Sequence, residues 1–303
     1  MAMPVIPELL QALLEDQYGA ETAARISRGY THQRPVTLRV NPLRADRETV
    51  ETQLALAGIA WENKPWYQDA MILRDVREEA VQALEVYERG GVYLQNLSAM
   101  IPPLVLEPKA GETILDMAAA PGGKTTQMAA LSGNQALITA CEKNKIRAER
   151  MQYNLEKQGA SRVGVMMEDA RKLDDFFSFH KILLDAPCSG SGTVLLLEGE
   201  PQRRMTRDWL NKTAATQTAM LQKALKLLKP GCEMVYSTCS ILRMENEDVV
   251  RKCIARANAE VLPIEHELMK HVPQLPVTIP GTLCVCPDEL HEGFFVARIR
   301  KKK

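Results

Sequence analysis

Hydrophobic and polar positions follow two different periods along most of the chain. Short apolar runs bounded by polar or small residues predict buried strands at 113–118, 136–142, 163–168, 181–187, 233–240, 283–287 and 294–299. Between several of these runs the apolar positions recur with helical spacing, at 124–131, 144–159 and 213–231. Alternating strands and helices are typical of an α/β fold with a mostly parallel, doubly wound sheet.

The first ninety or so residues follow a different pattern. Apolar positions with helical spacing alternate there with strand-like runs, the helices falling at 6–19, 47–58 and 77–91 and the strands at 35–41 and 71–76. This predicts a small N-terminal α+β domain over 1–90, ahead of a larger domain over 91–303, with a boundary near the pair Gly90 and Gly91.

Charge and cysteine content narrow the class of protein. The 303 residues hold 38 Lys and Arg and 38 Asp and Glu, so net charge points to neither nucleic acid nor a membrane. No apolar run reaches membrane-spanning length, and we expect no membrane partner. The seven cysteines lack paired zinc spacing, so we expect no bound metal. We expect Cys284 and Cys286 to be structural residues. The odd number of cysteines fits a cytoplasmic protein. The sequence shows no assembly signature, and we therefore expect a monomer.

A glycine turn follows the first predicted strand of the larger domain, in "AAAPGGKTT" at 118–126. A triphosphate-binding loop would need a glycine where Ala118 stands, and Pro121 removes an amide donor from the middle of the loop. What remains is a strand, a turn of small residues and a helix N-terminus, which suits close approach of a ligand to the backbone.

Acidic residues stand at the ends of successive predicted strands. Ligands of doubly wound sheets bind at these carboxyl ends. Each acid alone would be read as a helix cap or a solvated loop residue. Together with the glycine turn they suit a nucleoside ligand without polyphosphate, because an acid can bind a ribose or an ammonium but repels phosphate. The three acids are Asp116, Glu142 and Asp169, and the next strand ends in the motif that begins with Asp185.

Two cysteines also lie at the ends of adjacent predicted strands, Cys188 in "DAPCSGSG" and Cys239 in "STCS". Buried packing or a disulfide would be alternative interpretations. A thiolate near a nucleoside cofactor favours attack on carbon 6 of a pyrimidine, which makes carbon 5 nucleophilic enough to accept a methyl group. Asp185 could then hydrogen-bond the ring.

Several motifs resemble the Nol1/Nop2/Sun family of S-adenosylmethionine-dependent RNA cytosine-C5 methyltransferases. They are "RVNPLR" (39–44), "GGVYLQNLSAM" (90–100), "AAAPGGKT", "DAPCSGSG", "YSTCS" and "EGFFVARI" (292–299). The resemblance implies a class I methyltransferase (Rossmann-like) fold with a mostly parallel seven-stranded sheet and helices on both faces. It also implies that the N-terminal domain is RNA-recognition-like.

The resemblance also implies roles for individual residues. Cys239 is the expected nucleophile and Cys188 assists release of the product. Lys124 and Asp185 are expected beside the target base, Glu142 at the cofactor ribose and Asp169 at its adenine amine. The turn that binds the methionine end of S-adenosylmethionine comprises Ala118, Ala119, Ala120, Pro121, Gly122, Gly123 and Lys124.

The expected partner is RNA, either ribosomal or transfer RNA, with the target cytosine single-stranded or flipped out. We expect contact through the N-terminal domain, the basic cluster at 203–207 and the basic tail at 297–303. The segment 193–204 departs from the family pattern and could change how RNA reaches the cleft. Two alternatives are a methyltransferase acting on DNA or a small molecule, and an RNA-binding or ribosome-assembly factor without turnover.

Overall fold

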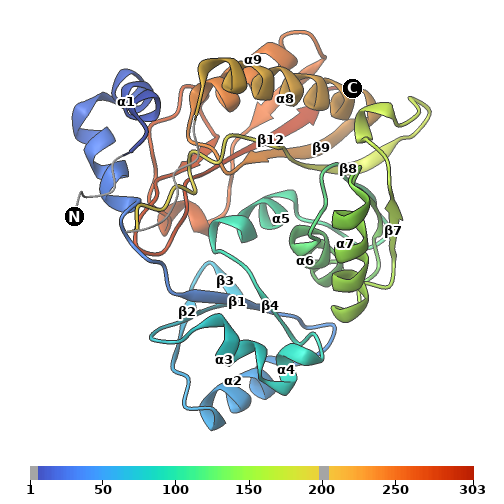
Figure 1. Ribbon diagram of the computed structural model, residues 1–303. Helices are drawn as coiled ribbons and strands as arrows, with labels where there is room; N and C mark the ends of the chain where they lie inside the picture. Colours follow the sequence, from blue (N-terminus) through green and yellow to red (C-terminus); the bar gives the residue numbers. More distant parts are fainter. Residues whose placement is uncertain (1–5, 198–204) are drawn as a thin grey trace.

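The computed structural model describes residues 6–197 and 205–303, which form two sheets with helices packed around them (Figure 1). The smaller sheet has the order β2-β3-β1-β4 and antiparallel neighbours. Its strands are β1 (Val36–Val40), β2 (Trp61–Lys64), β3 (Tyr67–Leu73) and β4 (Val92–Leu94). Its helices are α2 (Arg47–Leu56), α3 (Glu78–Gln82) and α4 (Glu85–Glu88). Their apolar residues share one core with those of β1 and β3, so this α+β unit has a core of its own.

The larger sheet has the order β10-β12-β9-β8-β5-β6-β7, with β11 paired to β12. Its parallel strands are β5 (Thr113–Asp116), β6 (Leu137–Cys141), β7 (Val163–Met166), β8 (Phe179–Asp185) and β9 (Leu228–Thr238). The antiparallel strands are β10 (Ala259–Leu262), β11 (Leu283–Val285) and β12 (Phe294–Lys301). The predicted mostly parallel sheet is therefore confirmed, with β10 as an additional strand.

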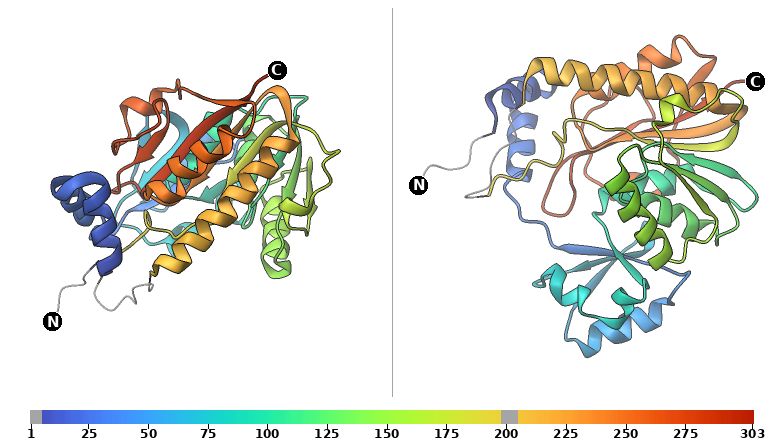
Figure 2. Two further views of the ribbon diagram at one scale, coloured as in Figure 1. Left: turned by 90° about the horizontal axis from the view of Figure 1, so that it is seen from above. Right: turned by 45° about the vertical axis from the view of Figure 1, so that its right-hand side comes forward.

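Helices cover both faces of the larger sheet (Figure 2). Alternate strand residues point to opposite faces: Ile114 and Leu183 belong to one core, whereas Leu115 and Leu184 belong to the other. The first core includes α5 (Ile101–Leu106), α6 (Gly123–Leu131) and α7 (Lys145–Lys157). The second includes α8 (Arg207–Leu227) and α9 (Glu247–Ile254). Single turns of 3-10 helix are η1 (Ser98–Met100), η2 (Ala170–Lys172), η3 (Arg243–Glu245) and η4 (Glu267–Lys270).

The first helix, α1 (Glu8–Gly29), packs against the larger sheet, although its position in the sequence suggested the small α+β domain. Leu10 and Leu14 are fully buried in the core that contains α8 and α9. The Tyr18 hydroxyl donates a hydrogen bond to the Ile241 carbonyl at 2.7 Å, and the Tyr30 hydroxyl donates to the Ser191 carbonyl at 2.5 Å. Figure 1 shows α1 beside the C-terminal part of the fold and away from β1–β4. The division of the chain near residue 90 remains a prediction.

Helix α8 differs from its prediction at both ends. It begins at Arg207, where the Thr206 side chain accepts a hydrogen bond from the backbone N–H of Trp209, and ends at Leu227. The pair Pro230 and Gly231, expected to end this helix, lies within β9 instead. Within the described ranges, no helix combines the length and apolar content that crossing a bilayer requires.

Candidate active site

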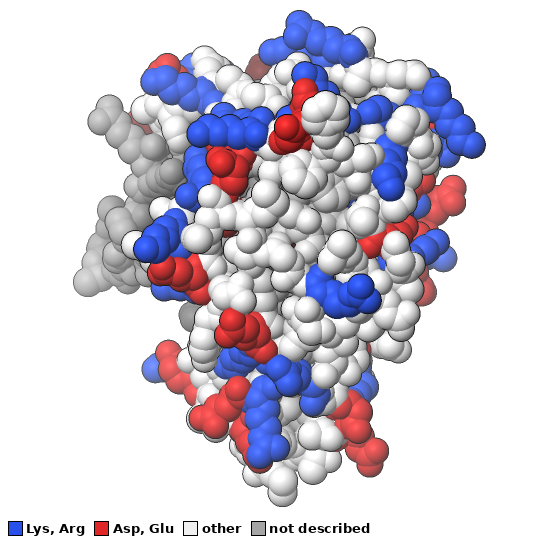
Figure 3. Space-filling model, turned by 90° about the vertical axis from the view of Figure 1, so that its right-hand side faces the viewer, with Lys and Arg blue, Asp and Glu red and all other residues white. Residues whose placement is uncertain are grey.

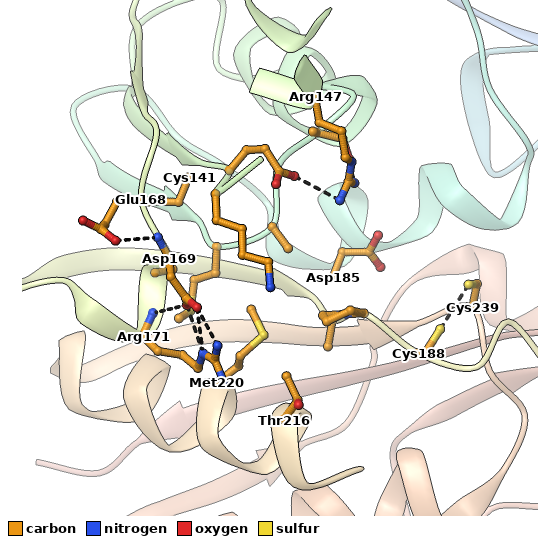
Figure 4. A pocket seen from close by; sticks show the side chains of 18 residues that line it. Cys141, Arg147, Glu168, Asp169, Arg171, Asp185, Cys188, Thr216, Met220 and Cys239 are labelled. Atoms are coloured by element: carbon orange, nitrogen blue, oxygen red, sulfur yellow. Dashed lines mark hydrogen bonds and ion pairs between the residues drawn. The ribbon is translucent and has the colours of Figure 1, made fainter. Parts of the chain in front are cut away.

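The carboxyl ends of the parallel strands meet at one edge of the larger sheet, as expected from the sequence. A cavity of about 280 Å³ lies there and is lined by residues that follow β5, β6, β7, β8 and β9 (Figure 4). Among the predicted site residues it brings together Ala118, Ala120, Glu142, Asp169, Asp185, Cys188 and Cys239. A second cavity of about 240 Å³ shares Ala118, Ala120 and Asp185 with the first and adds Asp116, Ala119, Pro121, Gly123 and Lys124.

The two predicted cysteines face each other, with 3.1 Å between the sulfur atoms of Cys188 and Cys239. Both thiols are free. The hydrogen bond with the Cys239 thiol, together with burial, raises the pKa of Cys188 well above its usual range. Cys188 therefore keeps its proton at neutral pH, next to the sulfur atom of Cys239.

Two glycines keep the cysteine loops close together. The Gly192 amide donates to the Cys239 carbonyl at 3.0 Å, and the Gly293 amide donates to the Gly192 carbonyl at 2.8 Å. A Cβ on Gly192 would lie 2.0 Å from the Gly293 carbonyl oxygen, and one on Gly293 would lie 2.6 Å from Cγ2 of Ile241. No other residue fits at either position without moving a loop.

Lys124 and Asp185 form an ion pair beside the cysteines. Lys124 Nζ lies 2.8 Å from Asp185 Oδ2, and the Ser237 hydroxyl donates to Asp185 Oδ1 at 2.8 Å. Burial alone would lower the pKa of the Lys124 ammonium, but the charge and hydrogen bond of Asp185 outweigh burial and hold that pKa above its usual range. The pair therefore presents a fixed cation and a fixed carboxylate to the space between the two cavities.

Asp116, the acid that ends β5, is buried under the glycine turn. Its Oδ2 accepts a hydrogen bond from the Thr125 hydroxyl at 2.7 Å, while Oδ1 has no partner of good geometry among the described residues. Burial raises the pKa of this carboxyl to about 6. A donor placed in the second cavity could satisfy Oδ1 and favour the ionised carboxylate.

The glycine turn forms as predicted. Gly122 has φ 104°, the left-handed region that favours glycine, and caps the N-terminus of α6 without lining either cavity. A Cβ on Gly123 would lie only 3.0 Å from the ring of Tyr93, which comes from β4 of the smaller sheet. The Ala120 carbonyl accepts a hydrogen bond from Arg147 Nη2 at 2.9 Å. The turn is thus held from α7 on one side and from β4 on the other.

The carboxylates of Glu142 and Asp169 both have hydrogen-bond or ion-pair partners, but the partners differ. The Glu142 side chain is buried, accepts from the Asn144 amide at 2.8 Å and lies 3.2 Å from Arg147 Nη1. Asp169 is paired with Arg171 at 2.5 Å, and this bond holds the pKa of the Asp169 carboxyl at about 2 (Figure 4). A ligand amine at Asp169 would therefore share the carboxylate with Arg171.

Several residues in or around the site were missed from the sequence, among them Arg171, Ser237 and Glu245. Arg171 lines the first cavity, Ser237 positions Asp185, and Glu245 accepts hydrogen bonds from both cysteine loops. Arg171 and Glu245 lie in polar stretches that resemble ordinary helix starts, so nothing in the local pattern marks them. Ser237 could have been found, because it precedes the Thr-Cys-Ser motif at a strand end.

Of the two basic regions expected to contact RNA, the tail lies away from the cavities and the cluster at 203–207 is only partly described. The tail continues β12, where Arg298 pairs with Glu233 at 2.7 Å and Arg300 pairs with Glu260 at 2.6 Å. Strand β12 runs antiparallel to β9. Its C-terminal end, which carries the basic tail, therefore lies at the opposite end of the strands from the cysteines. Within the cluster at 203–207 and the segment 193–204, residues 198–204 lie outside the described residues.

Comparisons with known proteins agree with this architecture. The family model described as "16S rRNA methyltransferase RsmB/F" matches residues 103–300, and one described as "Methyltr_RsmF/B-like, ferredoxin-like domain" matches residues 6–78. A solved structure titled as a methyltransferase homolog protein from Pyrococcus horikoshii superposes with a TM-score of 0.82 at 30% identity, covering 98% of this chain and 100% of that one. The predicted methyltransferase fold is thereby confirmed.

Two curated relatives give the same family. The probable ribosomal RNA small subunit methyltransferase B of Bacillus subtilis (strain 168) is 32% identical over 304 residues, covering 98% of this chain and 66% of its own length. The ribosomal RNA small subunit methyltransferase F of Shewanella sp. (strain ANA-3) is 35% identical over 274 residues, covering 88% of this chain and 56% of its own. The chain thus spans between about half and two thirds of these relatives.

Proposed function

Because this chain belongs to the RsmB/F methyltransferases of the Nol1/Nop2/Sun group, we propose that it methylates carbon 5 of a cytosine in RNA through a covalent adduct with Cys239. The observation that carries this proposal is the pair of free thiols 3.1 Å apart, next to the Lys124–Asp185 ion pair. Methyl transfer to an oxygen or to an exocyclic nitrogen needs no such pair of thiols, whereas transfer to carbon 5 needs a nucleophile at carbon 6.

The donor set of the two cavities fits S-adenosylmethionine. Glu142 offers a buried carboxylate for the ribose hydroxyls, and Asp169 offers a half-buried carboxylate, shared with Arg171, for the adenine amine. The turn Ala118–Gly123 and the unsatisfied Oδ1 of Asp116 suit the polar methionine end. S-adenosylmethionine, when bound there, supplies an electrophilic methyl group.

The side chains then divide the chemistry. Cys239, as a thiolate, adds to carbon 6 of the cytosine, and the electron pair of the C5–C6 double bond becomes available at carbon 5. Asp185 accepts a hydrogen bond from the ring or its amine, held in place by Lys124 and Ser237. After methylation, carbon 5 releases its proton to solvent in the cavity, the electrons of that C–H bond restore the C5–C6 double bond, and Cys239 leaves as a thiolate. Cys188, which keeps its proton, assists this release.

The proposed substrate is ribosomal RNA of the small subunit, which is the substrate class named for both curated relatives. The reacting cytosine is presented from a single strand or flipped out of a helix, because stacked neighbours shield carbon 6. Transfer RNA is the alternative substrate, and sequencing of the trapped RNA distinguishes the two.

Trapping of a protein–RNA adduct tests the proposal. Wild type, Cys239→Ala, Cys188→Ala and the double variant are incubated with total RNA and S-adenosylmethionine and resolved on denaturing gels. We expect Cys188→Ala to accumulate an RNA adduct that disappears in the double variant. Cys239→Ala should lower the rate of carbon-5 methylation by about a thousandfold or more, as loss of a catalytic nucleophile does.

Cys232→Ala serves as the matched control, because Cys232 is a free, half-buried cysteine on β9 away from the cavity. It should behave as wild type in both assays. Retention of carbon-5 methylation by Cys239→Ala contradicts the nucleophile assignment. Absence of methylation by wild type on any RNA favours a binding or assembly role instead.

A further inference from the structure

Glu245 lies buried between the two loops that carry the cysteines, at the end of η3. Its Oε1 accepts a hydrogen bond from the Ser189 backbone N–H at 2.8 Å. Its Oε2 accepts from the Ser189 hydroxyl at 2.5 Å and from the Ser240 hydroxyl at 2.6 Å. Each serine directly follows a cysteine in the sequence, so one carboxylate is bonded to both cysteine loops at once.

The surrounding amides fix the direction of these bonds. The Ser191 amide donates to the Ser189 oxygen at 3.2 Å, and the Leu242 amide donates to the Ser240 oxygen at 3.1 Å. Each hydroxyl oxygen therefore accepts from an amide and is free to donate its own proton to Glu245. All three of these bonds use a Glu245 oxygen as the acceptor, and the Gln217 side chain adds a longer contact of 3.5 Å to Oε1.

A second set of bonds joins the loops on either side of this carboxylate. The hydroxyls of Ser191 and Ser240 lie 2.8 Å apart, and the Ile241 amide donates to the Ser191 oxygen at 3.0 Å. From α8, the Gln217 side chain donates to the Pro187 carbonyl at 2.9 Å. The network spans both loops, and Glu245 is the charged group at its centre.

We infer that Glu245 is a positioning residue, one that holds the Cys188 and Cys239 loops at the separation the reaction needs. The inference rests on the proposed function for its catalytic meaning, but the separation of the thiols can be measured without it. Glu245 acts through Ser189 and Ser240, and it lines neither of the two cavities.

The inference requires a carboxylate at this position and predicts that its amide will fail. In Glu245→Gln one oxygen becomes an NH₂ donor of nearly the same size. If the NH₂ replaces Oε1 it faces the backbone N–H of Ser189, and if it replaces Oε2 the hydroxyls of Ser189 and Ser240 lose the acceptor for their own protons. Either orientation leaves a buried donor without its acceptor, so we expect the two loops to separate.

The first test measures the thiols directly, with neither RNA nor S-adenosylmethionine present. Diamide oxidises two neighbouring thiols to a disulfide and is itself reduced to the hydrazine, so its rate reports how often the sulfur atoms meet. Wild type should form the Cys188–Cys239 disulfide, seen by peptide mass after digestion. Glu245→Gln should form it more slowly, by about tenfold or more, as expected for a displacement on the order of 1 Å.

Glu247→Gln provides the matched control. Glu247 lies two residues further along, is also buried and receives its hydrogen bond from the Thr278 amide, away from both cysteine loops. The same substitution there should leave the disulfide rate at the wild-type value. Equal rates in wild type and Glu245→Gln would overturn the inference, as would an equal slowing in the two variants.

Methylation kinetics provide the second test. Glu245→Gln should lower kcat about a hundredfold and leave KM for S-adenosylmethionine within about twofold, because the cofactor cavity is untouched. A rise in KM with unchanged kcat contradicts a positioning role. If wild type methylates no RNA, the proposed function fails, while the disulfide rates still decide whether Glu245 positions the thiols.

Serine variants keep the inference testable if Glu245→Gln does not fold. Ser189→Ala and Ser240→Ala each remove one hydroxyl from Oε2 and leave the carboxylate in place. Each should slow disulfide formation severalfold, with the thermal unfolding temperature recorded alongside. Wild-type disulfide rates in both folded serine variants contradict the inference.

Discussion

The carboxyl of Asp116 is enclosed beneath the glycine turn, and its protonation is therefore linked to folding. Burial raises the pKa of this group to about 6 in the folded chain, above its value when unfolded. A carboxyl whose pKa is raised contributes stability that is fully present below the unfolded pKa and is lost as pH rises through the folded pKa. The relevant window is therefore about pH 4 to 6.

Asp116→Asn should remove this pH dependence. The amide has the same shape, keeps an acceptor for the Thr125 hydroxyl and cannot ionise. Between pH 4 and pH 7 the free energy of unfolding of wild type should fall by about 2–3 kcal/mol relative to the variant, measured by urea titration at both pH values. The exposed Asp208→Asn should keep the wild-type pH dependence. A constant difference between Asp116→Asn and wild type contradicts the linkage.

Residues of the site were predictable where chemistry coincides with a strand end. The two cysteines and Asp185 follow from the rule that ligands bind at the carboxyl ends of parallel strands, whereas the role expected for Lys124 came from the family resemblance. Glu245 could not be found in this way, because a buried acid and a solvated helix-capping acid look the same in the sequence. Only the fold brings its carboxylate between Ser189 and Ser240.

At the scale of elements, the period of apolar residues predicted most strands and helices of the larger sheet. The strand β10 was missed because its four residues are only half-buried and give no apolar run. The packing position of α1 was also missed. An amphipathic pattern shows that a helix has an apolar face, but it does not show which surface that face contacts. Tertiary packing, which the sequence does not display, places α1 on the sheet with α8 and α9.

The packing of α1 predicts a cost for truncating its buried face. Leu14→Ala should lower the free energy of unfolding by about 2–5 kcal/mol, because the removed methyl groups leave a cavity in the core of the larger sheet. Denaturant titration measures this. The control is Leu56→Ala on α2, where the side chain is 84% exposed and little should change. A negligible effect at Leu14 would show that α1 is not part of this core in solution.

At the scale of the whole molecule, a buried arginine joins the two sheets. Arg39, on β1 of the smaller sheet, is fully buried and donates to Gln95 Oε1 at 3.2 Å and to Thr126 Oγ1 of α6 at 3.0 Å. The helix it reaches is the one that begins at the glycine turn. The smaller sheet is therefore attached to the helix whose first two residues line the second cavity.

Arg39→Ala should destabilise the chain by about 2–3 kcal/mol or more, because it leaves buried polar groups of Gln95 and Thr126 without their donors. Denaturant titration followed by circular dichroism measures the loss. Arg74→Ala, at a half-exposed side chain paired with Glu62, should cost less than about 1 kcal/mol. Equal effects of the two substitutions contradict a structural role for Arg39 at the junction.

The distribution of charge is also a property of the whole molecule. The face shown in Figure 3 carries Lys and Arg together with Asp and Glu around an uncharged centre, in keeping with the balance of charges in the sequence. Arg298 and Arg300 in the basic tail are neutralised by glutamates at the far edge of the sheet. These two arginines therefore add no net positive charge at that end of the sheet.

The contact between Gly192 and Gly293 has a consequence for reading mutational data. In a saturation scan scored by activity, both positions would tolerate almost nothing. They would rank with Cys239 and Lys124, for which we proposed catalytic roles, although neither glycine carries a functional group. Their intolerance would reflect the close backbone contact between Gly192 and Gly293, which leaves no room for a Cβ atom. A ranking by sensitivity alone would count the two glycines among the proposed reacting groups. Their role is instead to let two backbone segments approach closely.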